Sequence, residues 1–284
     1  MLRSTGLFVL LSTFLFCACQ TFPPGERLKD IARAPDRQHT VKSVGNEIEY
    51  SVCQLYRYFT MCRAVWKIRD SYKDADWQLD YFYDEPTNTL GLTILENGVL
   101  HIIFRSSQAP KDKVDLKYNS RFLKRRDSIF PNDKIRAHRG FLDKYHSIRP
   151  EVLARVEATE TPKIRLIGHS GGAAMVGIAF MDLRHRYPQI EIDAVTYGMV
   201  RVFNHHGQEW FEPYRNEFLR IVNGRDPFPN IPPALFGYRH VGRLIRIGRR
   251  PWYKIFSSYD HYRGYQHVLE EMLIERGVEP SDCY

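Results

Sequence analysis

Beyond residue 140, the pattern of apolar and polar positions alternates between short apolar runs and stretches with helical spacing. The expected helices are 141–156, 171–186, 208–216 and 261–275, and the expected strands are 163–167, 190–197, 218–222 and 238–247. Short apolar strands alternating with helices are typical of a mostly parallel sheet with helices on both faces. The pattern therefore predicts an α/β fold, in which ligands bind at the carboxyl ends of the strands.

The first half of the chain adds a helix and a hairpin. Residues 46–68 carry apolar side chains at helical spacing and predict one long helix. Asn97-Gly98 separates two runs of strand-forming residues, 90–94 and 99–104. An Asn-Gly pair in that position is a strong hairpin signal, because both residues accept the backbone that a tight turn requires.

The N-terminal residues have the layout of an export signal. Arg3 precedes an almost unbroken apolar run over 6–16, which is too short to span a bilayer comfortably. Small residues follow, and Cys19 after Ala18 resembles the lipidation site of bacterial lipoproteins. We expect Cys19 to become an acylated N-terminus, with plain signal cleavage as the alternative.

The chain of 284 residues is long enough for one large domain. We expect residues 1–18 to be the signal peptide, 19–45 a tether and 46–284 the folded domain. Gln20 is not the Asp that often marks inner-membrane retention, so the expected location is the outer membrane, facing the periplasm. Simple secretion is the alternative.

The net charge is +8, from 41 Lys and Arg against 33 Asp and Glu. A positive chain favours anionic partners, either nucleic acid or a membrane surface. No zinc-finger spacing or RNA-binding aromatic motif accompanies the charge, which argues against nucleic acid. A solvated basic surface is the plain alternative.

Cysteine spacing leaves the disulfide open. Cys53 and Cys62 fall in one expected helix, where about 13 Å and opposite faces separate them, so they cannot pair with each other. Cys283 can pair with either of them in an oxidising compartment, and the sequence does not choose. No cysteine spacing typical of a metal site is present.

Gly168-His169-Ser170-Gly171-Gly172 fits the pattern G-x-S-x-G. An expected strand ends just before it and an expected helix begins just after it, which is the context of a nucleophile elbow. A sharp turn exposes the Ser170 hydroxyl above the sheet, and the helix N-terminus presents N–H groups to a developing oxyanion. The alternative is a turn of small residues that only allows close packing.

A serine nucleophile needs a histidine base and an acid that orients it. In α/β-hydrolases these follow the serine in the order acid, then histidine. Asp226 follows the expected strand 218–222, and His261 begins the last expected helix. The predicted catalytic residues are therefore Ser170, Asp226 and His261.

Other histidines fit this order less well. His240 belongs to an expected strand start and His267 lies inside an expected helix. His205 and His206 precede the acid and so break the order.

Several ordered motifs resemble the class 3 lipases, which include the fungal triacylglycerol lipases, over roughly residues 46–275. The matching segments are Arg105-Ser106-Ser107, His138-Arg139-Gly140-Phe141, Gly168 to Ala173, Tyr197-Gly198-Met199-Val200-Arg201-Val202, Val222 to Pro233 and Tyr238-Arg239-His240-Val241-Gly242. The resemblance implies an α/β-hydrolase fold with Ser170, Asp226 and His261 as the triad. It also implies an oxyanion hole formed by the N–H groups of Ser107 and Gly171.

Three departures from the family pattern concern the efficiency of the site more than the type of reaction. Ser106 stands where the family has Gly, Gly171 stands where it has Leu, and Met199-Val200 lacks the usual Pro.

The stretch between Ser107 and His138, where the family carries a lid, does not have the pattern of an amphipathic helix. Residues 113–118 alternate as a strand does, and residues 111–127 carry seven basic side chains. These are Lys111, Lys113, Lys117, Arg121, Lys124, Arg125 and Arg126. They predict a rim that meets anionic lipid head groups, with an exposed basic strand pair as the alternative.

Together these features predict a serine carboxylic-ester hydrolase that acts on lipid esters through an acyl-enzyme and uses no metal or cofactor. Its expected partners are a lipid or ester substrate and a membrane surface. One rival is a phospholipase, lysophospholipase or acyltransferase with the same triad. The other is a catalytically degenerate envelope binding protein.

Overall fold

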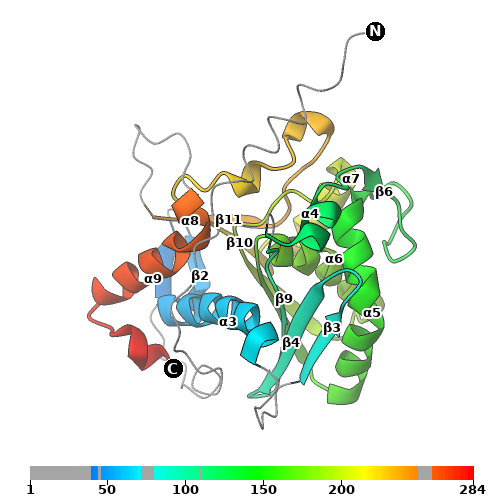
Figure 1. Ribbon diagram of the computed structural model, residues 1–284. Coiled ribbons are helices and arrows are strands. Elements are labelled where there is room, and N and C mark those ends of the chain that lie inside the picture. The colour runs from blue at the N-terminus through cyan, green and yellow to red at the C-terminus, as the bar shows by residue number, and fades with distance from the viewer. Residues whose placement is uncertain (1–39, 44–45, 72–79, 109–110, 249–257) are drawn as a thin grey trace.

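A computed structural model describes residues 40–43, 46–71, 80–108, 111–248 and 258–284 (Figure 1). The expected signal peptide, Cys19 and most of the expected tether lie outside these residues. Of the helices in the described ranges, none combines the length and the apolar character needed to cross a bilayer.

A seven-stranded sheet forms the centre of the domain, in the order β11-β10-β9-β8-β5-β4-β3. The strands are β3 (Asp80–Asp84), β4 (Thr89–Glu96), β5 (Val99–Phe104), β8 (Lys163–His169), β9 (Glu191–Tyr197), β10 (Phe218–Asn223) and β11 (Arg243–Ile247). The five strands from β5 to β11 are parallel, and only β4 and β3 join by antiparallel pairing. The mostly parallel sheet predicted from the sequence is confirmed.

Helices cover both faces of this sheet (Figure 1). One face packs against α5 (Arg139–Thr159) and α6 (Gly171–Arg186), and the other against α3 (Val52–Ser71) and α9 (Gly264–Ile274). Successive residues of a strand point to opposite faces, so Ile102 joins the first core and Ile103 the second. Both faces are buried, which explains why the strands appear in the sequence as continuous apolar runs.

The hairpin between β4 and β5 forms where Asn97-Gly98 predicts it. Asn97 has φ +50° and Gly98 has φ +76°, the left-handed values that a two-residue hairpin turn requires.

Residues 46–51 are a strand, so the prediction of one helix over 46–68 was wrong at its start. β2 (Asn46–Ser51) pairs with β1 (Thr40–Ser43), which falls inside the expected tether. Ser51 then ends the strand with a capping box. Gln54 N–H donates to Ser51 Oγ at 3.1 Å, and Ser51 N–H donates to Gln54 Oε1 at 2.8 Å. These reciprocal bonds give partners to the N–H groups of Ser51 and Gln54, so the helix begins at Val52.

Residues 113–119 form the helix α4 (Lys113–Asn119), so the strand expected over 113–118 was wrong. Asp112 caps the helix by accepting hydrogen bonds from the N–H groups of Val114 at 2.8 Å and Asp115 at 2.9 Å. β6 (Lys124–Arg125) and β7 (Ala137–His138) follow as a short antiparallel pair.

Other elements begin or end at residues different from those expected. The strand expected over 238–247 starts only at Arg243, because Gly242 has φ +69° and turns the chain tightly against Phe218. The last helix is divided into α8 (Ser258–Tyr262) and α9. Residues 205–211 form α7 (His205–Phe211), whose N-cap is Asn204, and Glu212–Tyr214 continue as a 3-10 turn.

Cys53 and Cys283 form a disulfide with their Cα atoms 5.1 Å apart, which resolves the choice that the sequence left open. Cys62 is a free thiol buried in the same helix as Cys53. The disulfide joins α3 to the 3-10 turn Pro280–Cys283 near the end of the chain.

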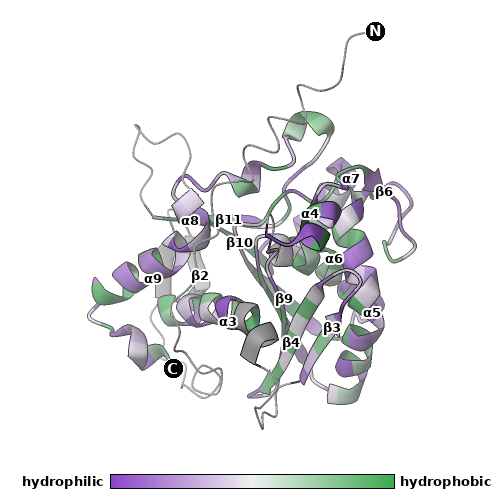
Figure 2. Cartoon of the chain, in the orientation of Figure 1, coloured by the Kyte–Doolittle hydropathy of each residue, from purple (hydrophilic) through white to green (hydrophobic). Residues whose placement is uncertain are grey.

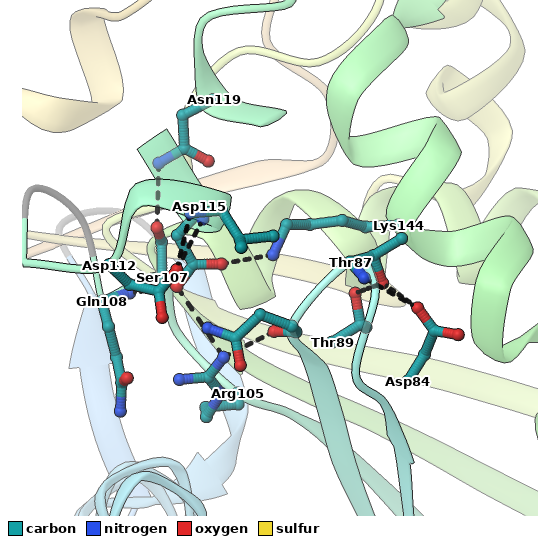
Figure 3. Close-up of polar contacts among 12 residues, drawn as sticks. Asp84, Thr87, Thr89, Arg105, Ser107, Gln108, Asp112, Asp115, Asn119 and Lys144 are labelled. Atoms are coloured by element: carbon teal, nitrogen blue, oxygen red, sulfur yellow. Dashed lines mark hydrogen bonds and ion pairs between the residues drawn. The ribbon is translucent and has the colours of Figure 1, made fainter. Parts of the chain in front are cut away.

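A buried cluster of charges fixes α4 to the rest of the domain (Figure 3). The Asp115 side chain is fully buried and accepts hydrogen bonds from Lys144 Nζ on α5 and, at 2.6 Å, from Gln108 N–H. Arg105, at the end of β5, places its Nη2 atom 3.7 Å from Asp115 Oδ2. Asn119 at the other end of α4 donates to Ser107 Oγ at 2.9 Å. The helix is thus held on the loop that follows β5.

The disulfide should contribute strongly to stability, because it closes a loop of 230 residues. Replacing Cys53→Ser should lower the free energy of unfolding by about 2–5 kcal/mol. The measurement is urea unfolding of the variant and the wild type, with and without dithiothreitol. The reductant should destabilise the wild type alone. An equal response of both proteins to the reductant would contradict the assignment.

The buried ion pair should be costly to break from one side. Lys144→Met leaves the Asp115 carboxylate without its ammonium partner and should lower the free energy of unfolding by about 3–5 kcal/mol. Asp115→Leu together with Lys144→Met should recover part of that loss. Glu191→Gln, which removes an exposed partner of Lys163, is the matched control and should cost about 1 kcal/mol or less. Similar losses at both pairs would show that burial of the charges does not matter.

Candidate active site

Ser170 occupies a sharp turn between β8 and α6. Its backbone angles are φ +55° and ψ −119°, a conformation that L residues rarely adopt. A Cβ atom at Gly168 would lie 2.7 Å from the backbone of Gly172, and one at Gly172 would lie 2.3 Å from the carbonyl oxygen of Phe104. Because any larger side chain would clash there, glycine is required at positions 168 and 172. The sharp turn between them carries Ser170 at the end of β8.

The three predicted catalytic side chains meet at this turn. His261 Nε2 lies 2.9 Å from Ser170 Oγ, and His261 Nδ1 lies 2.9 Å from Asp226 Oδ2. The side chains of Asp226 and His261 are fully buried. An ionised carboxylate can only accept, so Nδ1 carries the proton and Nε2 is the acceptor that faces the Ser170 hydroxyl. The arrangement can therefore take a proton from Ser170.

The candidate acid has two further donors. Tyr265 donates its hydroxyl to Asp226 Oδ2 at 2.7 Å, and Phe228 N–H donates to Asp226 Oδ1 at 3.0 Å. Burial, and then the charge of Asp226, raise the pKa of Tyr265 well above its usual value, so its hydroxyl stays protonated as a donor. Sequence reasoning missed Tyr265. Its only signal is a spacing of four residues after His261.

The ring of His261 has two close neighbours. Phe228 stacks on it with ring centroids 3.8 Å apart and an interplanar angle of 19°. A Cβ atom at Gly198 would lie 2.8 Å from Asp226 Oδ2 and 2.9 Å from His261 Nδ1. Gly198 also has φ +57°. Only glycine fits this position, which explains the Tyr197-Gly198 motif.

The two candidate oxyanion residues lie side by side. A Cβ atom at Gly171 would be 3.1 Å from Ser107 Cβ and 3.4 Å from Ser107 N. Gly171 also begins the 16-residue helix α6, whose N-terminus carries partial positive charge. The hydrogen bond from the Asn119 side chain to Ser107 Oγ fixes the Ser107 side chain.

Ser106, which departs from the family's glycine, makes a specific contact. Its Oγ lies 3.0 Å from His169 Nδ1, and His169 Nε2 lies 2.8 Å from the carbonyl oxygen of His261. A carbonyl can only accept, so Nε2 carries the proton and Nδ1 accepts from Ser106. Burial, and then the neighbouring His261, lower the pKa of His169 well below its usual value, so this ring stays neutral. Sequence reasoning missed this connection.

The rival histidines lie elsewhere. His267 Nε2 lies 3.2 Å from Glu271, and His205 and His206 both face Glu209 on an exposed helix. Burial, and then the charge of Arg220, lower the pKa of His240 to about 2.

The basic stretch 111–127 is partly neutralised. Arg121 and Arg125 form ion pairs with Asp143 at 3.1 Å and 2.7 Å. Lys111, Lys113, Lys117 and Arg126 remain exposed.

Comparison with known protein families gives a match to the class 3 lipases over residues 101–236. The chain is similar to the lipase of Rhizopus niveus, with 29% identity over 164 residues, or 55% of this chain and 40% of that one. It is also similar to secreted mono- and diacylglycerol lipase 1 of Fusarium solani, with 34% identity over 108 residues, or 37% and 32% of the two chains. The chain thus spans two fifths or less of the length of these relatives.

Solved structures establish the fold. A fungal lipase in complex with an inhibitor superposes with a TM-score of 0.65 at 19% identity, covering 77% of this chain and 95% of that one. Lipase II of Rhizopus niveus superposes with a TM-score of 0.57 at 20% identity, covering 75% and 87%. The sheet that carries Ser170 and Asp226 is therefore an α/β-hydrolase sheet, and the matched segment contains both residues together with Ser107. Over residues 101–236 the chain is thus similar to the class 3 lipases, and its fold is that of the fungal lipases.

Proposed function

We propose that this protein hydrolyses carboxylic esters of lipids, with Ser170 as nucleophile, His261 as general base and Asp226 as the acid that orients it. The observation that carries the proposal is the continuous hydrogen-bonded series from Ser170 Oγ through His261 to Asp226, with 2.9 Å at each step. The match to the class 3 lipases over residues 101–236 and the relatives named lipase support a lipid ester as the substrate.

The reaction follows from these positions. As Ser170 Oγ attacks the ester carbonyl, His261 Nε2 takes the hydroxyl proton, and the carbonyl oxygen becomes an oxyanion. The N–H groups of Ser107 and Gly171 donate to this oxyanion. Collapse breaks the bond to the alcohol, which leaves with the proton from His261. Water then attacks the acyl-enzyme by the same route and releases the carboxylic acid.

Removal of the nucleophile should abolish hydrolysis without unfolding the protein. Ser170→Ala should lower the turnover of a soluble short-chain ester at least about a thousandfold, and His261→Ala should do nearly the same, because the triad acts as a unit. Asp226→Asn should keep more residual activity. The assay is release of free acid, with circular dichroism as the check on folding.

His267→Ala is the matched control, because it removes an exposed histidine that faces Glu271 on the same helix as Tyr265. It should leave turnover unchanged. Wild-type turnover in Ser170→Ala would refute the assignment of the nucleophile.

We also propose that the protein is exported and anchored by a lipid at Cys19 to the outer membrane, facing the periplasm. The basic start and apolar run before Cys19 support export, as do the relatives named as secreted lipases. The Cys53–Cys283 disulfide fits an oxidising compartment. Several acyl chains on one cysteine would hold the enzyme at a surface where its substrate already lies.

Fractionation of cells that produce the protein tests this anchor. The wild type should sediment with outer membranes and carry a mature N-terminus at Cys19 by mass spectrometry. Cys19→Ala should lose the lipid and leave the membrane fraction, whereas Cys62→Ser, a buried thiol, should not change fractionation. A fully soluble wild type whose N-terminus lies elsewhere would leave simple secretion as the explanation.

A further inference from the structure

The loop between β10 and β11 ends in an exposed apolar turn. Leu235 and Phe236, in the 3-10 turn Ala234–Phe236, are 83% and 37% exposed, and Leu123 is 71% exposed. The residues on both sides of Leu123 contact this turn. The rings of Phe122 and Phe236 lie 6.0 Å apart, and Lys124 Nζ donates to the carbonyl of Phe236. We call Leu235 and Phe236, together with Leu123 between the two residues that contact their turn, the apolar tip. In Figure 2 the turn itself has hydrophobic colouring.

Cations lie around the apolar tip. Lys124 donates to the carbonyl of Phe236, Arg239 donates to that of Ala234 at 3.1 Å, and Arg201 donates to that of Pro232 at 2.9 Å. Burial, and then the charges of Arg136 and Arg239, lower the pKa of Lys124, while burial and Arg239 lower the pKa of Arg201. Lys124 is therefore repelled by Arg136 and Arg239, and Arg201 by Arg239. In the described part of the chain, none of the four forms an ion pair with a carboxylate. Such a cluster is available to an anionic partner.

Positive charge is also concentrated in the stretch of sequence that includes this loop, the strand β11 and the residues after it. Residues 227–259, between Asp226 and Asp260, contain no Asp or Glu and six Lys or Arg. The stretch 111–127 has seven basic residues but also three Asp, and its Arg121 and Arg125 pair with Asp143. The four cations at the apolar tip thus come from separate segments of the chain, and of Lys124, Arg136, Arg201 and Arg239 only the last lies in the β10–β11 loop.

This loop also carries part of the candidate active site. It contains Asp226 and also Phe228, which stacks on His261. Arg201 then fixes the loop by donating to the carbonyl of Pro232 at 2.9 Å and to that of Asn230. In Figure 1 the loop lies at the end of the molecule that carries α4 and α8. A surface bound by the apolar tip would therefore be held near the site.

We propose that the apolar tip and its four cations form a docking surface for anionic lipid membranes. Leu123, Leu235 and Phe236 enter the interface between head groups and acyl chains, while Lys124, Arg136, Arg201 and Arg239 bind the phosphates of the head groups. The purpose of such docking rests on the proposed hydrolysis of lipid esters. Binding of the protein to a membrane can be measured without turnover.

Vesicle binding tests the docking surface. The full chain is used with Cys19→Ala and Ser170→Ala, so that neither a lipid anchor nor hydrolysis contributes. Co-sedimentation compares vesicles of phosphatidylcholine alone with vesicles that contain phosphatidylglycerol. The parent should bind the anionic vesicles more tightly, and added salt should weaken the binding.

Two double variants separate the apolar and charged parts. Lys124→Gln with Arg239→Gln should weaken binding to anionic vesicles about tenfold or more, since each basic residue near such a surface contributes about a factor of five. Leu235→Ser with Phe236→Ser should also weaken it about tenfold. Lys111→Gln with Lys117→Gln removes the same charge from exposed positions of the other basic stretch and should leave binding nearly unchanged.

Three outcomes would overturn the proposal: equal binding to neutral and anionic vesicles, parental binding by either tip variant, or an equal loss in the matched control. Binding to duplex DNA as tight as to anionic vesicles would also do so. In the Ser170 background, both tip variants should hydrolyse a soluble ester at the wild-type rate, which checks folding. Vesicle binding without any esterase activity would instead refute the proposed function and leave the docking surface standing.

Discussion

The geometry of the candidate site depends on the close approach of three backbones at the end of β8. Gly172 lies directly against the carbonyl oxygen of Phe104, at a distance that excludes a Cβ atom. This contact brings the start of α6 against the end of β5. The nucleophile turn and the loop containing Ser107 therefore face each other. Without that approach, the turn that gives Ser170 its φ of +55° would not lie against the loop that contains Ser107.

The acid and the base are both positioned from the end of β10. Asn223, its last residue, donates through its side-chain amide to the carbonyl oxygen of Asp260 at 3.1 Å. Asp260 in turn accepts from Arg225 N–H at 2.7 Å. Asp226 and His261 are 35 residues apart in sequence, yet these two bonds join Asp260, immediately before His261, to Asn223 and Arg225, just before Asp226. The distance between the carboxylate and the imidazole is thus set by backbone as well as by the side chains themselves.

Features governed by local rules could be predicted from the sequence. The Asn97-Gly98 hairpin, the glycines around Ser170 and the alternation of strands and helices each depend on a few neighbouring residues. The start of α3 was also readable, because Ser51 and Gln54 have the spacing of a capping box, but apolar periodicity alone placed it too early.

Features governed by distant contacts could not be predicted. Residues 113–118 alternate like a strand, yet they form a helix that Asp112 caps and whose Asp115 is buried in a cluster with Lys144 on α5. The choice of Cys53 over Cys62 for the disulfide depends on where the end of the chain packs. His169 and Tyr265 have ordinary sequence surroundings, and only the folded chain brings them to His261 and Asp226.

Two departures from the family pattern lie on one interface, between the loop after β5 and the turn after β8. At Ser106 a side chain is added on the loop, and its hydroxyl donates to His169 in the turn. At Gly171 a side chain is absent from the turn, where a Cβ atom would come within 3.1 Å of Ser107 Cβ. The larger side chain at position 106 of the loop is therefore accompanied by a smaller one at position 171 of the turn. Because His169 also donates to the carbonyl oxygen of His261, the added hydroxyl connects the candidate oxyanion loop to the candidate base, a connection that glycine at position 106 could not make.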